Sequence, residues 1–145
     1  MEFLETRDCL CLASRRAART ITRAYDKALR VHGLRATQFS LLSALSLKGP
    51  LSLGSLAALL DIERTTLTRN IAIVENRGLV SSSPGKDPRA RMLAVTDKGR
   101  DLLTRALADW RAVQHGLTAD MGVEAADQLR RIAGPLRLPA EGETP

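Results

Sequence analysis

The stretch DIERTTLTRNIAIVENRGLV, residues 61–80, decides the fold. Within it, Leu67, Ile71 and Val74 recur at three- and four-residue steps, which predicts a helix with one apolar face. Gly78 follows at the position where a left-handed residue commonly ends a helix. The opposite face carries short or polar side chains, which are Thr65, Thr68, Arg69, Ala72 and Asn76. Such side chains let a helix lie close to base edges, and arginine pairs bidentately with guanine, so this face suits duplex DNA; an ordinary solvated surface is the alternative.

The residues before this helix predict two more helices. Thr37 is expected to cap a helix that runs through several apolar residues and stops at Lys48-Gly49-Pro50. Ser52 is expected to cap a short third helix. Only Asp61-Ile62-Glu63 then separates it from the fourth helix, which spans about residues 64–77. Two short helices joined by three residues are typical of a helix-turn-helix.

After Gly78 the helical period gives way to two short extended segments, residues 79–83 and 91–95. The loop between them is rich in turn formers and charge, which predicts a β-hairpin. Its basic side chains are Lys86, Arg89 and Arg91. A wing of this kind can hold the minor groove and phosphates beside the helix, and Asp87 is expected to orient a neighbouring arginine by a charge-assisted bond. A basic loop alone is usually just solvated, so it is the order helix, turn, helix and wing that indicates DNA binding.

A long helix is expected on each side of this unit. Residues 6–31 lack Gly and Pro and repeat apolar residues with a helical period, so they predict a first helix that Gly33 ends. Thr96 is expected to cap a long fifth helix, and Gly122 to separate it from a sixth. These three helices have more apolar surface than one small core can hide, which predicts a homodimer.

The expected fold class is therefore mainly α with a small β-hairpin wing. It is a single domain, in which a winged helix-turn-helix lobe is flanked by N- and C-terminal dimerisation helices. The expected boundaries are 36–96 for the lobe, 1–35 and 97–138 for the dimerisation helices, and 139–145 for a flexible tail.

Composition limits the partners. The 145 residues carry a formal net charge of +6, which favours a polyanion, although an acidic membrane surface would also attract it. Aromatic residues, on which single-stranded nucleic acid stacks, make up only 3%, so a duplex is expected. We find no secretory signal and no apolar run of about 20 residues, so a cytoplasmic protein without membrane contact is expected. The isolated His32 and His115 do not form a metal site, and without a nucleophile or phosphate-loop motif we expect neither an enzyme nor a cofactor.

Residues 61–80, with Lys86-Asp87-Pro88-Arg89 and Val95-Thr96-Asp97-Lys98-Gly99, resemble the MarR family of winged helix-turn-helix regulators over nearly the whole chain. The resemblance implies that four residues of the fourth helix meet DNA, namely Thr65, Thr66, Thr68 and Arg69. It also implies a wing-tip arginine at Arg89 with Asp87 as its acidic companion. Many relatives carry a basic residue where this chain has Ser81-Ser82-Ser83, which puts phosphate contact from that strand in question.

The resemblance further implies a dimer that commonly represses transcription until a small molecule or an oxidant changes the spacing of its two DNA-reading heads. A two-fold dimer meets half-sites about one helical turn, roughly 34 Å, apart, which predicts a palindromic operator. The effector cleft of the family lies between the dimerisation helices and the lobe. The residues expected there are Arg16, Arg19, Arg23, His32, Phe39 and Trp110. An anionic or aromatic effector is expected. Solvated surface and phosphate contact are alternative roles for the basic stripe of the first helix, which consists of Arg16, Arg19, Arg23, Lys27 and Arg30.

Two other functions stay open. Cys11, with Tyr25 fourteen residues later, has a spacing similar to the reactive cysteine of the organic-hydroperoxide-sensing branch of the family, which implies a thiol-based, peroxide-sensing repressor. On one continuous helix Cys9 and Cys11 would point about 200° apart and could not easily bridge. The second alternative is a helical interaction module that binds protein instead of DNA.

Overall fold

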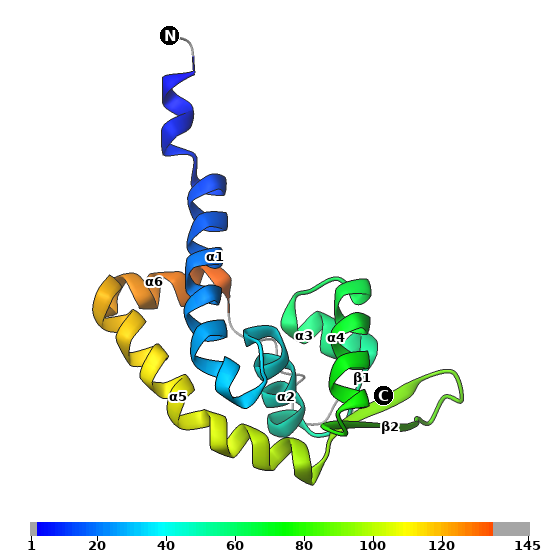
Figure 1. Ribbon diagram of the computed structural model, residues 1–145. Coiled ribbons are helices and arrows are strands. Elements are labelled where there is room, and N and C mark those ends of the chain that lie inside the picture. The colour runs from blue at the N-terminus through cyan, green and yellow to red at the C-terminus, as the bar shows by residue number, and fades with distance from the viewer. Residues whose placement is uncertain (1–2, 135–145) are drawn as a thin grey trace.

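In a computed structural model, which describes residues 3–134, the chain forms a compact lobe and an extended frame (Figure 1). The elements are the 3-10 helices η1 (Leu4–Asp8) and η2 (Arg30–His32), the α-helices α1 (Leu10–Leu29), α2 (Ala36–Lys48), α3 (Leu53–Leu60), α4 (Arg64–Asn76), α5 (Asp97–Met121) and α6 (Val123–Ala133), and the strands β1 (Leu51–Ser52), β2 (Val80–Pro84) and β3 (Arg91–Val95). Figure 1 shows α2, α3, α4 and the hairpin gathered on one side, with α1, α5 and α6 forming the frame. The predicted fold class, mainly α with a winged helix-turn-helix, is confirmed.

The lobe has a leucine-rich core closed by a small antiparallel sheet in the order β1-β3-β2. The hairpin pairs Val80 with Val95 and Ser82 with Leu93, so the predicted strands are confirmed to within one residue. β1 was not predicted, because two residues are too few to show an alternating pattern. Its Leu51 pairs with Leu93 and ties the start of α3 to the hairpin.

Side-chain hydrogen bonds explain the starts of α2, α3 and α5. Ser52 Oγ accepts a hydrogen bond from the Ser55 N–H at 3.1 Å, and Thr96 Oγ1 accepts one from the Gly99 N–H at 3.1 Å, which confirms both predicted caps. The predicted cap at Thr37 is wrong, since α2 already begins at Ala36. A carboxylate from α1 replaces it, because Asp26 Oδ1 accepts from the Ala36 N–H at 2.7 Å. That bond joins residues ten apart, beyond the reach of a rule for local caps.

The first helix is shorter than predicted. Residues 6–31 do not form one helix, because Cys9 is extended, with φ −64° and ψ 114°, and separates η1 from α1. The 200° angle expected between Cys9 and Cys11 therefore does not apply, since only Cys11 lies within the helix. At the other end the helix tightens into η2 and stops at Gly33, whose left-handed φ of 67° fits glycine.

The frame exposes much of its apolar surface. Leu29 is the buried residue of α1 and Ala126 that of α6, whereas Leu10, Leu12, Val123, Leu129 and Ile132 are exposed. Within residues 3–134, none of the helices combines the length and apolarity needed to cross a bilayer. The predicted tail at 139–145, and the end of the predicted dimerisation segment beyond residue 134, lie outside the described residues.

Candidate nucleic-acid interface

α4 is attached to the lobe by one face and exposes the other. Leu67, Ile71 and Val74 are buried, which confirms the predicted apolar face. The exposed side chains include the predicted DNA-binding residues Thr65, Thr66, Thr68, Arg69 and Asn76. Thr68 Oγ1 donates to the Arg64 carbonyl oxygen at 2.7 Å, so its proton is used within the helix. Its methyl group and lone pairs are left for a partner, and these suit a thymine methyl group or a base-edge donor.

The wing presents exposed basic residues on a tightly closed loop. They are Lys86, Arg89 and Arg91. The Gly85 N–H donates to the Ala90 carbonyl oxygen at 2.7 Å and closes the loop. A Cβ at Gly85 would lie 2.9 Å from that same oxygen, so this close approach requires glycine. The loop is therefore a closed turn whose backbone requires glycine at this position.

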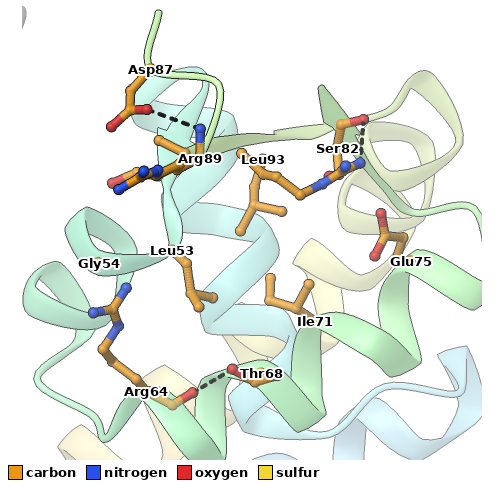
Figure 2. Close-up of a pocket in the computed structure, with 13 residues that line it drawn as sticks. Leu53, Gly54, Arg64, Thr68, Ile71, Glu75, Ser82, Asp87, Arg89 and Leu93 are labelled. Carbon is orange, nitrogen blue, oxygen red and sulfur yellow. Dashed lines mark hydrogen bonds between the residues drawn. The ribbon is translucent and has the colours of Figure 1, made fainter. Parts of the chain in front are cut away.

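Asp87 braces the wing backbone. Its Oδ1 accepts a hydrogen bond from the Arg89 N–H at 2.9 Å (Figure 2). The expected bracing of a neighbouring arginine by Asp87 is confirmed, and the group that its carboxylate bonds is the Arg89 backbone N–H. Aspartate commonly bonds the backbone two residues on, which fixes a turn. The bond positions the Arg89 main chain and leaves its guanidinium for a partner.

Arg91 compensates for the missing charge of strand β2. Its Nε donates to Ser82 Oγ, and its Nη2 donates to the Ser82 carbonyl oxygen at 3.4 Å. The guanidinium of Arg91 is thus held over the Ser81-Ser82-Ser83 run, which has no basic residue of its own. Positive charge is present at this strand, supplied from its hairpin partner.

α4, the wing and the start of α3 surround a cavity of about 500 Å³. Arg64 and Arg89 both line it, from α4 and from the wing (Figure 2). Arg64 was missed as a site residue, although it stands one turn before Thr68 and its basic charge could have identified it. Figure 2 shows its guanidinium directed toward Gly54, where a Cβ would lie 3.7 Å from Arg64 Nη2. Three arginines line the groove, Arg91 being the third, against the two carboxylates of Glu75 and Asp87, so its charge suits an anion such as a phosphate chain.

A second cavity, of about 490 Å³, lies between α2 and α5. Phe39 and Trp110 line it and stack, with ring centroids 6.0 Å apart and an interplanar angle of 13°. Arg100 is the arginine among its lining residues. The walls are otherwise leucine, serine and threonine, so the cavity combines a flat aromatic surface with one positive charge.

The structure divides the six predicted effector residues. Phe39 and Trp110 lie in the α2–α5 cavity. His32 lies beside it, since its Nε2 donates to Asp109 Oδ2 at 2.6 Å, next to Trp110. The exposed Arg16, Arg19 and Arg23 are on α1 and do not line this cavity, in which Arg100 is the basic residue. Their role as effector ligands stays a prediction.

Cys9 and Cys11 are both free and exposed. Tyr25 lies fourteen residues beyond Cys11, which is about 21 Å at the rise of an α-helix. Its hydroxyl donates to Gln114 Oε1 of α5, so within one chain it is directed away from the thiols. Among residues 3–134, no group of three or more His, Cys, Asp or Glu side chains is placed to hold a metal ion.

Comparison with known proteins gives consistent matches. The sequence model of the MarR family matches residues 34–89. An uncharacterised HTH-type transcriptional regulator of Bacillus subtilis, YhbI, is 30% identical over 107 residues, which are 72% of this chain and 69% of that protein. The M. tuberculosis transcriptional regulator MosR in complex with DNA is 41% identical, with a TM-score of 0.75, over 90% of this chain and 100% of that one. A further match is the transcriptional repressor CouR of Rhodococcus jostii RHA1, bound to a 23-mer DNA duplex. It is 27% identical, with a TM-score of 0.77, over 89% of this chain and 92% of that one.

Proposed function

The chain belongs to the MarR family of DNA-binding transcriptional regulators, and from this premise we propose that it is a homodimeric repressor that leaves a palindromic operator when a small molecule enters the α2–α5 cavity. The observation that carries the proposal is the groove between α4 and the wing. It brings Arg64 and Thr68 of α4 together with the braced Arg89 of the wing. The existence of a MosR complex with DNA, at 41% identity, supports DNA binding by this chain.

Each part of this surface has a role that follows from its chemistry. Thr65, Thr68 and Arg69 enter the major groove, where small side chains permit close approach and the arginine selects guanine. Arg89 enters the adjacent minor groove, where the potential is most negative. The phosphate chain between the two grooves then passes Arg64, at the wall opposite the wing.

The apolar side chains of α1 and α6 support the dimer. Leu10 is 84% and Ile132 is 85% exposed in the single chain, and both lie on the frame, away from the DNA-reading surface (Figure 1). A second copy related by a two-fold axis buries them and presents two α4 helices to one face of the duplex. An inverted repeat in the operator follows from that symmetry.

The effector is inferred from the walls of the α2–α5 cavity. The stacked Phe39 and Trp110 offer an aromatic surface, and Arg100 offers a bidentate partner for a carboxylate. An aromatic acid, free or as a thioester, fits this combination. The cavity lies where α5 of the frame meets α2 of the lobe, so an occupant changes the angle between them.

A binding experiment tests the DNA proposal. An operator is selected from a random duplex pool, and the affinities of Arg69→Ala and Arg89→Ala are measured by fluorescence anisotropy across salt concentrations. We expect Arg69→Ala to cost about 1–3 kcal/mol and relax base preference at one position. Arg89→Ala should weaken binding to all sequences more evenly, and it should lower the slope of log affinity against log salt concentration by about one.

The matched control is Arg105→Ala, which removes an exposed arginine of α5 and should leave the base preference unchanged. If neither substitution nor added salt alters binding, the DNA proposal fails and the protein-interaction alternative replaces it.

The effector is tested with the single tryptophan of the chain. A panel of aromatic carboxylates and their thioesters is titrated while Trp110 fluorescence and operator release are followed. Ligands that quench Trp110 fluorescence should release DNA. Arg100→Gln should weaken the binding of carboxylates and leave the binding of uncharged analogues unchanged. Quenching without release would contradict the coupling.

The exposure of Cys11 keeps the thiol-based alternative as a second candidate. Cys11→Ser separates the two functions: derepression by small molecules survives it if the cavity is the sensor, whereas derepression by hydroperoxide is abolished if the thiol is. Cys9→Ser is the matched control, because this second free thiol is two residues away and is also exposed.

A further inference from the structure

The lobe and the frame are joined by two chain connections, residues 33–35 before α2 and residues 96–98 at the start of α5. Two connections between rigid parts define a hinge axis, and rotation about it would move α4 without breaking any covalent constraint. Apolar packing of Leu29, Leu102 and Ala106 holds the frame against the lobe, and contacts at the two connections further restrict the angle between them.

Arg77, the C-cap residue that directly follows α4, contacts both connections. Its Nη1 donates to the Gly33 carbonyl oxygen at 2.6 Å, at the first connection. Its own carbonyl oxygen accepts from Lys98 Nζ at 2.7 Å, at the second connection. The C-cap residue of the DNA-reading helix is thus bonded to both segments that lead into the frame.

Two further hydrogen bonds restrain this junction, by which we mean Arg77 with its bonded partners Gly33 and Lys98. Thr96 Oγ1 donates to the Gly78 carbonyl oxygen at 2.6 Å, so the residue after Arg77 is held by the second connection as well. His32, next to Gly33, donates to Asp109 of α5 at 2.6 Å and holds the first connection to the frame. A displacement of either connection relative to α4 must break a bond to a charged group, and such bonds are stronger than neutral ones.

We propose that Arg77 is a positioning residue that fixes α4 relative to the dimer axis and thereby sets the half-site spacing that the protein accepts. The inference rests on the proposed function, since it needs two α4 helices in one dimer. Arg77 itself lies at the inner end of α4, bonded to protein atoms, and its effect on DNA passes through the orientation of the helix. One added base pair separates half-sites by about 3.4 Å, so a rigid dimer should reject it and a hinged one should tolerate it.

The test compares three duplexes: the selected operator and versions with one base pair inserted or removed at its centre. The proteins are the wild type, Arg77→Met, which keeps the aliphatic stem, and Arg105→Met as a matched exposed arginine on the frame. For Arg77→Met we expect the preference for the native spacing to shrink by about tenfold, the effect of losing one bond to a charged group, with half-site base preference and salt slope unchanged. Arg77→Lys should restore part of the preference.

Lys98→Met removes the other half of the same junction and is the second test if Arg77→Met folds poorly. It should also reduce the preference for native spacing. The proposal would be overturned if both variants kept the wild-type ratio of affinities between the native and altered spacings. An equal loss of affinity for all three duplexes would also overturn it. Failure of the proposed function is different, because there the wild type itself would select no sequence.

A measurement without DNA gives a separate readout. A spin label at Thr66→Cys, in a background with Cys9 and Cys11 replaced by serine, reports the distance between the two α4 helices of the dimer by pulsed electron resonance. The distance distribution should be narrow in that background and broaden with Arg77→Met. An unchanged width would overturn the hinge argument whatever the DNA result.

Discussion

The lobe and the frame differ in how completely one chain specifies them. Almost every buried apolar residue belongs to the lobe or to the ends of α1 and α5 that contact it, while α1 and α6 bury one residue each. Side-chain oxygens also bond the starts of the lobe helices α2 and α3, from Asp26 and Ser52, whereas α1 and α6 of the frame begin without a side-chain cap. The lobe is therefore stabilised by its own sequence, and the frame depends on a second copy.

The largest expected effect is in the lobe core. Leu42→Ala removes a side chain that is 0% exposed and should lower the free energy of unfolding by about 2–5 kcal/mol, through lost burial and a residual cavity. Leu47→Ala is the same substitution in the same helix at a side chain that is 76% exposed, and it should cost far less. Urea denaturation of both variants measures the free energy of unfolding. Equal losses in the two variants would contradict the inference that the buried core of one chain stabilises the lobe.

In the frame the same logic predicts loss of association instead of loss of folding. Ile132→Asp places a charge at an apolar side chain that is 85% exposed in the single chain. Full burial of such a side chain contributes about 1.5–3 kcal/mol, so the dimer dissociation constant should rise at least about tenfold. Sedimentation velocity measures this change, with Leu47→Asp on the lobe as the control. A monomer–dimer equilibrium unaffected by Ile132→Asp would place the interface elsewhere.

The contrast also explains how far the sequence could predict the structure. The lobe followed from local signals: the period of Leu67, Ile71 and Val74, the cap at Ser52 and the stop at Gly78. The prediction was wrong where a residue distant in sequence determines the local structure. Asp26 takes the role expected of Thr37, and β1 exists because Leu93 pairs with Leu51.

The candidate site shows the same division. Residue types identified the exposed face of α4 and the basic wing, because both follow from spacing along one element. Sequence could not show that Asp87 bonds the Arg89 backbone, or that Arg91 lies over Ser82, since both depend on loop geometry. The opposed placement of Arg64 and Arg89, and the junction at Arg77, depend on how separate elements pack.

A smaller effect tests the local part of this contrast. Ser52→Ala removes the acceptor for the Ser55 N–H at the start of α3 and should lower the free energy of unfolding by about 1 kcal/mol. Ser55→Ala is the matched control, because it removes the hydroxyl that bonds Ser52 Oγ and keeps the N–H that the cap satisfies. Thermal denaturation of both variants should show a clear loss of stability only for Ser52→Ala. Equal losses would mean that the bond between the two hydroxyls matters and the cap does not.

The smallest effect concerns Tyr25, the one tyrosine of the chain, located where α1 meets α5. Burial raises the pKa of Tyr25 above its ordinary value of 10.0, and the positive charge of Arg130 opposes part of that rise. Because the folded protein favours the neutral phenol, the stabilisation is present below pH 10 and is lost as the pH rises through the folded pKa. Ultraviolet titration of the phenolate should give a midpoint above 10.0 in the native protein and near it in denaturant. If a second copy completes the frame, Ile132→Asp should lower that midpoint by removing further burial; an unchanged midpoint in a monomeric variant would show that one chain alone buries Tyr25.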